Sequence, residues 1–312
     1  MRKVFASSFF AGVLAIVLAA CGTAGPNVDD GAGARATSAG AFPVTLDTPE
    51  GPVRIDRRPT RIVSLSSTAT EMLFEVGAGD QVVAVDDQSD FPEGVPTTDL
   101  SGYEPNIEAI VSYGPDLVVA AGDAGGMVNG LRQLDVPVLV QPAAARLDDT
   151  YEQIRQLGDV TGHRTEADAV VDRMRADVAE ILAAAPGGEG LTVYHELDDT
   201  YYSVTSDTFI GQVYSMLGVE NIADEAKGAG SGYPQLSSEY IVDSDPSLIV
   251  LADGDCCGQS PATVAVRPGW KDLTAVSEGS VIAIDDDIAS RWGPRVVEFM
   301  RAVVDALDGS ST

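Results

Sequence analysis

Two segments of the chain repeat one pattern at an offset of 131 residues. Residues 106–120 read NIEAIVSYGPDLVVA, and residues 237–251 read SSEYIVDSDPSLIVL. The offset aligns Glu108 with Glu239 and matches several apolar residues and a proline. Each copy has the pattern of a short helix, a turn and a buried strand. Such a repeat predicts two lobes built on one plan. Convergence of unrelated segments on a common helix–turn–strand pattern is the alternative.

Short apolar segments alternate with helical patterns along both halves of the chain. This alternation predicts an α/β fold in which each lobe has a central, mostly parallel sheet flanked by helices. An edge hairpin at 42–46 and 53–55 begins the first lobe. The predicted strands are 61–65, 81–85, 118–121 and 136–140, then 192–195, 248–251 and 281–284; further helices are predicted at 209–217 and 294–307.

A helix is predicted from the serines after the first strand to Phe74, closed by Gly77. Glu71 stands three residues after Thr68, which is the spacing of a capping box.

The most helical stretch lies between the repeated units. We expect Thr165 to cap it and Pro186 to follow its end, with an apolar stripe along one side. About twenty residues give a rod about 30 Å long, enough to join two lobes. A long surface helix of one domain is the alternative. The predicted organisation is an N-terminal lobe at 42–148, a helical connector at 149–186 and a C-terminal lobe at 187–312.

The N-terminus has the features of an export signal. Two basic residues precede an apolar run that ends in Leu18-Ala19-Ala20-Cys21. The pattern resembles a bacterial lipobox, which predicts a signal peptide at 1–20 and a lipidated Cys21 that holds the protein on the membrane. A signal peptide with an incidental cysteine, or an uncleaved anchor, is the alternative. Residues 21–41 are rich in Gly and Ala and are expected to form a flexible tether.

Composition excludes several classes of function. The net charge of −29 excludes a protein that coats nucleic acid, because phosphate binding needs a basic face. Only 2 histidines are present, which excludes a His-rich zinc site, and 3 cysteines exclude a disulfide scaffold. Nucleophile-elbow, Walker A and dinucleotide-binding motifs are absent from the sequence. A secreted α/β enzyme is therefore a weaker hypothesis than a binding protein without catalytic activity.

The segment RIVSLSSTATEMLFEVGAGDQVVAVDDQSDFP (61–92), the first repeat copy and SRWGPRVVEFM (290–300) together resemble a known family. The resemblance is to the substrate-binding proteins of ABC importers, in the cobalamin and iron-siderophore group. It covers most of residues 42–307. It implies two lobes joined by one long rigid helix, little motion between them, and a ligand held in the cleft.

The resemblance also implies the partners. One acid at the tip of each lobe docks onto arginines of the membrane permease, and the matching residues here are Glu108 and Glu239. The simpler interpretation is that each acid stabilises the N-terminus of its helix through the helix dipole. We expect a monomer on the outer face of the cytoplasmic membrane, attached by lipid only. No intrinsic cofactor or metal and no catalysis are expected; the transported ligand is a corrinoid or a ferric siderophore.

Candidate ligand-binding residues come from two sources. In open α/β folds ligands collect beyond the carboxyl ends of the strands. The family resemblance adds two tyrosines before the paired glutamates and matches Asp287 and Arg291 to polar ligand contacts. The set predicted from strand ends is Ser67, Thr68, His195, Glu196, Cys256, Cys257, Asp287, Arg291 and Trp292, and the added tyrosines are Tyr103 and Tyr233.

Some of these residues have other interpretations. Trp292 could simply wedge the last helix against its lobe, and His195 could be a buried histidine with its polar atoms satisfied. A haem receptor of the same fold is a further alternative, with His195 or a tyrosine as axial ligand.

Basic residues narrow the ligand class. Arg291 is the one arginine at a predicted cleft position, whereas a triply anionic catecholate siderophore would require several. The sequence therefore favours a neutral or cationic ligand, either a corrinoid or a hydroxamate iron chelate.

Cys256 and Cys257 are adjacent in a loop after a predicted strand. Consecutive Cα atoms lie about 3.8 Å apart, below the usual disulfide range. Even so, an exported protein lives in an oxidising compartment, and no third cysteine is free once Cys21 is lipidated. The hypothesis is a vicinal disulfide on the cleft wall; the alternative is two free thiols.

The disulfide hypothesis predicts that the unfolded, unreduced protein has no maleimide-reactive thiol at these positions. Mass spectrometry after labelling would count the adducts. Two adducts at Cys256 and Cys257 would establish free thiols instead.

Overall fold

The structure is a computed structural model that describes residues 42–310. The predicted signal peptide (1–20), Cys21 and the tether (21–41) lie outside the described residues. Among residues 42–310, no helix has both the length and the apolar character needed to cross a membrane.

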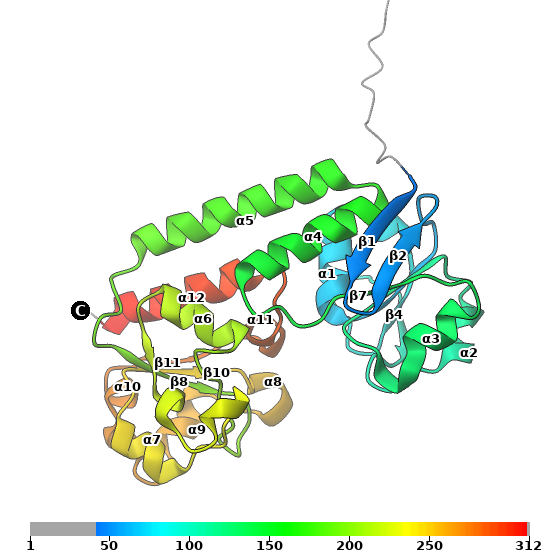
Figure 1. The fold of residues 1–312 in the computed structure, drawn as a ribbon. Coiled ribbons are helices and arrows are strands. Elements are labelled where there is room, and N and C mark those ends of the chain that lie inside the picture. The colour runs from blue at the N-terminus through cyan, green and yellow to red at the C-terminus, as the bar shows by residue number, and fades with distance from the viewer. Residues whose placement is uncertain (1–41, 311–312) are drawn as a thin grey trace, which may run out of the picture. The chain divides into compact units, whose positions relative to one another are not determined.

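The N-terminal lobe is built on a five-stranded parallel sheet in the order β5-β4-β3-β6-β7. Helices α1 and α4 cover one face, and α2 and α3 cover the other (Figure 1). An antiparallel hairpin of β1 (Val44–Thr48) and β2 (Gly51–Ile55) packs beside α4. The elements are β3 (Ile62–Leu65), α1 (Ser67–Glu75), β4 (Val82–Asp86), β5 (Thr97–Leu100), α2 (Ile107–Ser112), β6 (Leu117–Ala120), α3 (Met127–Arg132) and β7 (Val138–Val140).

The C-terminal lobe has a four-stranded parallel sheet in the order β11-β10-β8-β9. Helices α6 and α12 cover one face, and α7, α9 and α10 cover the other. The elements are β8 (Thr192–Glu196), α6 (Phe209–Met216), β9 (Glu220–Asn221), α7 (Ser238–Ser244), β10 (Leu248–Leu251), α8 (Gly254–Cys257), α9 (Pro261–Ala265), α10 (Thr274–Ser277), β11 (Val281–Ala283), α11 (Asp286–Ser290) and α12 (Val296–Ser310). Short 3-10 turns lie at η1 (Gly79–Gln81), η2 (Ala124–Gly126), η3 (Ile222–Glu225), η4 (Ala229–Ser231) and η5 (Trp270–Asp272). The predicted fold class is confirmed.

Two helices, rather than one, lie between the sheets. They are α4 (Leu147–Thr161) and α5 (Arg164–Ala184), which run side by side. The chain turns between them at Gly162, whose φ of 78° is in the left-handed region that glycine tolerates. The predicted cap at Thr165 is therefore wrong, because the turn places the helix start earlier, with His163 at the N-cap.

A single hydrophobic cluster joins the two lobes. It includes side chains of α1 and β3 in the first lobe, of α4 and α5, and of β8, α6 and α12 in the second. The terminal helix α12 packs along α5 (Figure 1). Since packed interiors resist deformation, this shared core favours a fixed arrangement of the lobes.

The repeated segments adopt the same structure. The first forms α2 and β6, and the second forms α7 and β10. Asn106 and Ser237 cap the two helices, and each accepts a hydrogen bond from the backbone N–H three residues later. Glu108 and Glu239 both lie in the exposed first turn.

The predicted capping box of α1 is wrong. Ser66 is the N-cap, and its hydroxyl accepts from the Ala69 N–H at 3.3 Å. Glu71 lies beyond the third helical position and is 3% exposed. Its carboxylate pairs with two arginines from the other end of the chain, which stabilise a buried charge far better than a backbone N–H.

Candidate functional site

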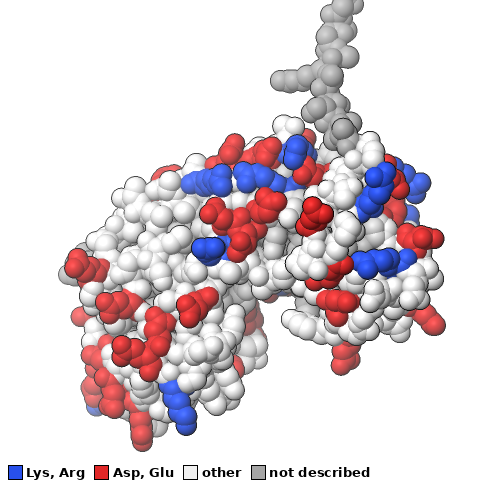
Figure 2. All heavy atoms as spheres, viewed as in Figure 1, with Lys and Arg blue, Asp and Glu red and all other residues white. Residues whose placement is uncertain are grey.

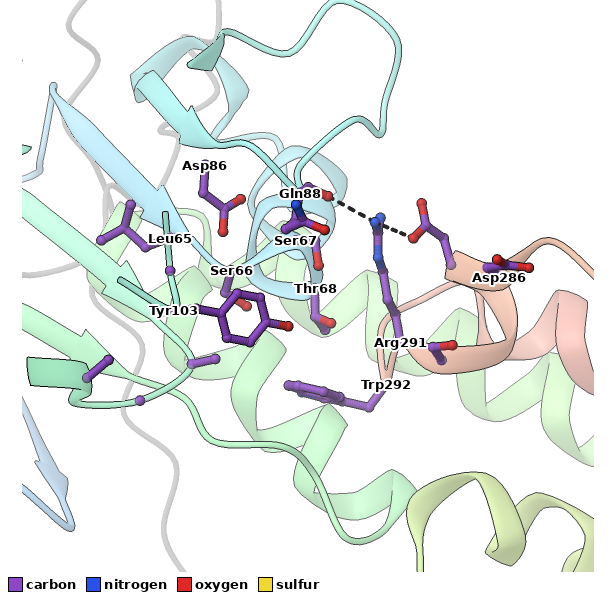
Figure 3. A pocket seen from close by; sticks show the side chains of 16 residues that line it. Leu65, Ser66, Ser67, Thr68, Asp86, Gln88, Tyr103, Asp286, Arg291 and Trp292 are labelled. Atoms are coloured by element: carbon purple, nitrogen blue, oxygen red, sulfur yellow. Dashed lines mark hydrogen bonds and ion pairs between the residues drawn. The ribbon is translucent and has the colours of Figure 1, made fainter. Parts of the chain in front are cut away.

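A cavity of about 530 Å³ lies where the N-terminal sheet meets the segment between α11 and α12. The carboxyl ends of β3, β4 and β6 form one side, and α11 with the residues after it forms the other (Figure 3). The lining residues are Leu65, Ser66, Ser67, Thr68, Asp86, Gln88, Gly102, Tyr103, Ala121, Gly122, Ala124, Asp286, Asp287, Ser290, Arg291 and Trp292.

Six of the predicted ligand-binding residues line this cavity. They come from three places in the chain: the start of α1, the loop after β5 and the α11 segment. Figure 3 shows Tyr103 and Trp292 pointing into the same space from opposite sides. Tyr103 is 82% exposed, so its ring is available to a ligand. The six are Ser67, Thr68, Tyr103, Asp287, Arg291 and Trp292.

Glu71 fixes the α11 segment to the N-terminal lobe. Arg291 Nη1 donates to Glu71 Oε1 at 2.8 Å. Arg295 donates from Nε to Oε2 at 3.0 Å and from Nη2 to Oε1 at 2.6 Å. All three side chains are largely buried. We call this group the Glu71 clasp.

Both terminal nitrogens of Arg291 have further partners. Its Nη2 donates to the Gln88 carbonyl at 3.0 Å, and the guanidinium also pairs with Asp90 and Asp287. Arg291 therefore lines the cavity with its charge already compensated by protein groups. It orients the wall more than it offers a free positive charge.

Trp292 is tied to α4 as well. Its carbonyl accepts from Thr150 Oγ1 at 2.9 Å, and its Nε1 donates to Gln153 Oε1 at 3.1 Å. The ring packs against the shared hydrophobic cluster and lines the cavity. Trp292 therefore both packs in the hydrophobic interior, as the wedge interpretation has it, and lines the cavity, as the ligand-binding interpretation has it.

The cavity has an acidic character. Three carboxyl groups line it, from Asp86, Asp286 and Asp287, against the one guanidinium of Arg291. Burial raises the pKa of Asp86, and it raises the pKa of Asp287 to about 6 despite the nearby Arg291. A low-dielectric site of this kind favours positive charge and hydrogen-bond donors in whatever it binds.

His195 and Glu196 are not brought to the cavity. Both are 0% exposed, because β8 is an interior strand whose two faces are covered by helices. His195 Nδ1 lies 2.7 Å from the Tyr214 hydroxyl, and burial lowers its pKa to about 3, so the imidazole is neutral. Glu196 accepts two hydrogen bonds of 2.6 Å from Arg267.

Asp253 lies beside this buried pair. Both of its carboxylate oxygens are buried without a hydrogen-bond partner among the described residues. Burial raises its pKa to about 7, and the neighbouring Glu196 adds to the effect. His195, Glu196 and Asp253 therefore have no surface to offer a ligand.

The structure joins Cys256 and Cys257 by a disulfide, in line with the vicinal-bridge hypothesis. Both residues are exposed in α8 and lie outside the cavity lining. The Cys256 N–H donates to Asp286 Oδ2 at 3.0 Å, and Asp286 does line the cavity. The backbone of Cys256 is thus hydrogen-bonded to a residue of the cavity wall, whereas the disulfide that the sequence predicts on the cleft wall is not among the lining residues.

Tyr233 lies in a separate recess. It is 51% exposed and faces Ala143–Ala145 of the loop after β7, across a space of about 320 Å³. The structure therefore places the two predicted tyrosines in different depressions.

Sequence reasoning missed three residues that shape the site. The sequence pattern predicts Glu71 as part of a helix cap and gives Arg295 and Asp86 no role. The signal that could have found the clasp is the spacing of Arg291 and Arg295, which puts two cations on one side of a short segment. In residues 42–310, no cluster of three or more His, Cys, Asp or Glu side chains is arranged to hold a metal ion.

Comparison with known proteins gives consistent matches. A family model described as periplasmic binding protein matches residues 62–288. An uncharacterized ABC transporter substrate-binding lipoprotein of Bacillus subtilis is 29% identical, over 94% of this chain and 93% of its own. A cobalamin-binding protein of Halobacterium salinarum is 33% identical, over 89% of this chain and 78% of its own. The periplasmic vitamin B12 binding protein of Vibrio cholerae superposes with a TM-score of 0.68 at 24% identity, covering 81% of this chain and 98% of that one.

The clasp yields a prediction for stability. Glu71→Gln leaves Arg291 and Arg295 buried without their shared counter-charge, which is expected to cost about 3–5 kcal/mol of unfolding free energy. Urea denaturation followed by circular dichroism measures it. The matched control is Glu75→Gln, one turn later in α1, where an exposed carboxylate pairs with Arg173 and a loss below about 1 kcal/mol is expected. Equal small losses in both variants would show that the clasp does not hold the structure.

Proposed function

The chain belongs to the periplasmic binding protein family, and from this premise we propose that it is the substrate-binding lipoprotein of an ABC importer. It captures a bulky metal chelate in the cavity at the lobe junction and delivers it unaltered to a membrane permease. The observation that carries the proposal is the cavity itself. Two aromatic rings and a row of polar groups face one space, on a wall fixed by the Glu71 clasp.

The favoured ligand is a corrinoid or a ferric hydroxamate. Tyr103 and Trp292 supply flat apolar surface to a large ligand. Ser66, Ser67, Thr68 and Gln88 supply neutral hydrogen-bonding groups. A catecholate chelate is disfavoured, because three carboxyl groups line the cavity and its one arginine is already paired. The cobalamin-binding relative supports the corrinoid choice.

A haem receptor is the alternative within the same fold. His195 is excluded as an axial ligand by its complete burial. Tyr103 is exposed in the cavity and is the residue that would have to serve. The carboxylates of haem would face the acidic lining, which makes haem the weaker choice.

We propose that Glu108 and Glu239 dock the protein onto arginines of the permease. Each is exposed in the first turn of a short helix whose N-cap is satisfied, so neither carboxylate is needed for capping. Acidic side chains also gather over the C-terminal lobe on the face drawn in Figure 2. Complementary charges of this kind steer association and set orientation.

Lipidated Cys21 would hold a monomer on the outer face of the cytoplasmic membrane, and residues 149–186 would connect the lobes. No chemical step on the ligand is proposed. The hydroxyl groups of the cavity have no histidine beside them, since His163 and His195 lie elsewhere.

The ligand assignment predicts an absorption signature. The purified protein is mixed with cyanocobalamin, ferrioxamine B, haemin or a ferric tris-catecholate, desalted and scanned. We expect near-stoichiometric retention of a corrinoid or the hydroxamate chelate. Retention of haemin alone would establish the haem alternative, and retention of the catecholate alone would contradict the charge argument.

Charge reversal tests docking separately from ligand binding. Glu108→Lys with Glu239→Lys is expected to lower ligand-stimulated ATPase activity of the reconstituted permease by at least about tenfold, because close charge pairs at interfaces contribute about 1.5 kcal/mol or more each. Ligand retention should not change. The matched control reverses two other exposed acids, Asp80 and Glu278. They lie before β4 and β11, at the amino ends of these strands. An equal loss in the control would argue against specific docking.

A further inference from the structure

Asp86 is a buried acid on the cavity floor. It is the last residue of β4, is 3% exposed and lines the cavity beside Ser66 and Tyr103 (Figure 3). Buried carboxyl groups normally pair with a cation or several donors, because desolvating a charge is costly. The groups around Asp86 therefore decide what this carboxyl is for.

One oxygen of Asp86 is held by a chain of buried hydroxyl groups. Ser89 Oγ donates to Asp86 Oδ1 at 2.6 Å, and Ser89 Oγ lies 2.9 Å from Thr70 Oγ1. Thr70 Oγ1 in turn donates to Ser64 Oγ at 2.9 Å. Ser64, Thr70 and Ser89 are at most 1% exposed. This chain fixes the orientation of the carboxyl group.

The second oxygen, Oδ2, accepts no side-chain or backbone hydrogen bond from any described residue outside the turn that contains Asp86. It faces Gly102, another lining residue, where a Cβ would lie only 3.1 Å from Oδ2 and 2.6 Å from the Leu65 carbonyl. Any larger residue at 102 would crowd this oxygen. Glycine therefore keeps Oδ2 open toward the cavity.

No protein cation is available to Asp86 within the cavity lining. Arg291 is the one basic residue there, and its guanidinium is engaged by Glu71, Asp90 and Asp287. Burial disfavours the ionised form of Asp86 and the charge of Asp87 adds to this, so the pKa of Asp86 is raised although Ser89 and Arg291 act in the opposite direction. A hydrogen-bond donor on a bound ligand would reduce the cost of burying the Asp86 carboxylate.

We infer that Asp86 is a specificity-determining residue, whose Oδ2 accepts a hydrogen bond from an N–H group on the rim of the bound chelate. The chemical class is a chelate that carries carboxamide or ammonium groups at its periphery. Chelates whose rim presents carboxylate or phenolate oxygens meet a second acceptor at this point and are rejected. The inference rests on the proposed function and deepens it.

The test compares selectivity, not affinity alone. Asp86→Asn keeps the size and the acceptor for Ser89 but turns an N–H₂ toward the cavity in place of Oδ2. We expect affinity for cyanocobalamin, rich in carboxamides, or for ferrioxamine B, with its ammonium, to fall about tenfold or more. Affinity for haemin, with its carboxylates, should rise or stay constant. Fluorescence quenching of the cavity tryptophan reports each titration, and the two N–H probes distinguish carboxamide from ammonium recognition.

Two further variants keep the result interpretable. Asp99→Asn makes the same charge change on the neighbouring strand β5, on an exposed side chain outside the lining, and should alter each affinity less than twofold. Asp86→Ser removes the carboxylate without adding an amide, and it should also lower the affinity for cyanocobalamin and ferrioxamine B. This variant keeps the test possible if the asparagine variant misfolds.

The outcomes separate the two claims. If the wild type binds an N–H probe and Asp86→Asn changes all ligands equally or none, the inference about Asp86 is overturned while the proposed function stands. If the wild type retains only haemin or the catecholate, or none of the probes, the corrinoid or hydroxamate assignment and the inference about Asp86 are both overturned.

Discussion

A carboxylate that is almost out of reach of water, paired with two guanidinium groups, is the contact on which this architecture depends. Glu71 belongs to the first helix of the N-terminal lobe, and Arg291 and Arg295 lie 220 and 224 residues further along the chain. Buried charges of this kind need their partners, because removing one partner leaves the other charge buried and uncompensated, which lowers the free energy of unfolding substantially. Asp90 and Asp287 compensate the second positive charge. The segment that carries Trp292 is therefore fixed in place from both lobes.

This fixed segment is also one wall of the cavity, so stability and recognition depend on the same residues. The hydrophobic cluster that runs from β3 through α5 to α12 adds to the effect, because it packs side chains of both lobes into one interior that resists deformation. The protein is therefore a receptor whose binding site is formed before the ligand arrives. Such preorganisation lowers the ordering cost of binding. The acidic lining, with its paired arginine, then decides by charge and hydrogen bonding which chelate fits.

Much of this could be predicted from sequence, and the failures have physical causes. The repeat around Glu108 and Glu239 and the short apolar strands predicted the two sheets, because local patterns determine them. The strand-end rule found Thr68 and Arg291 at the cavity. The same rule nominated His195, yet it cannot tell an open strand end from one that helices cover on both faces. Glu71 looked like a cap because its local spacing fits one, and its true partners are remote in sequence.

The distance between the lobes tests the central claim most directly. Spin labels are placed at positions 80 and 278 in a variant with serine in place of the native cysteines. Pulsed electron–electron double resonance would then report the distance between the lobes without any ligand. The account predicts one narrow distance distribution in the protein with Glu71 intact, and a broad or divided one after Glu71→Ala. An equally narrow distribution in both proteins, or a broad one in both, would contradict the claim that this carboxylate holds the lobes together.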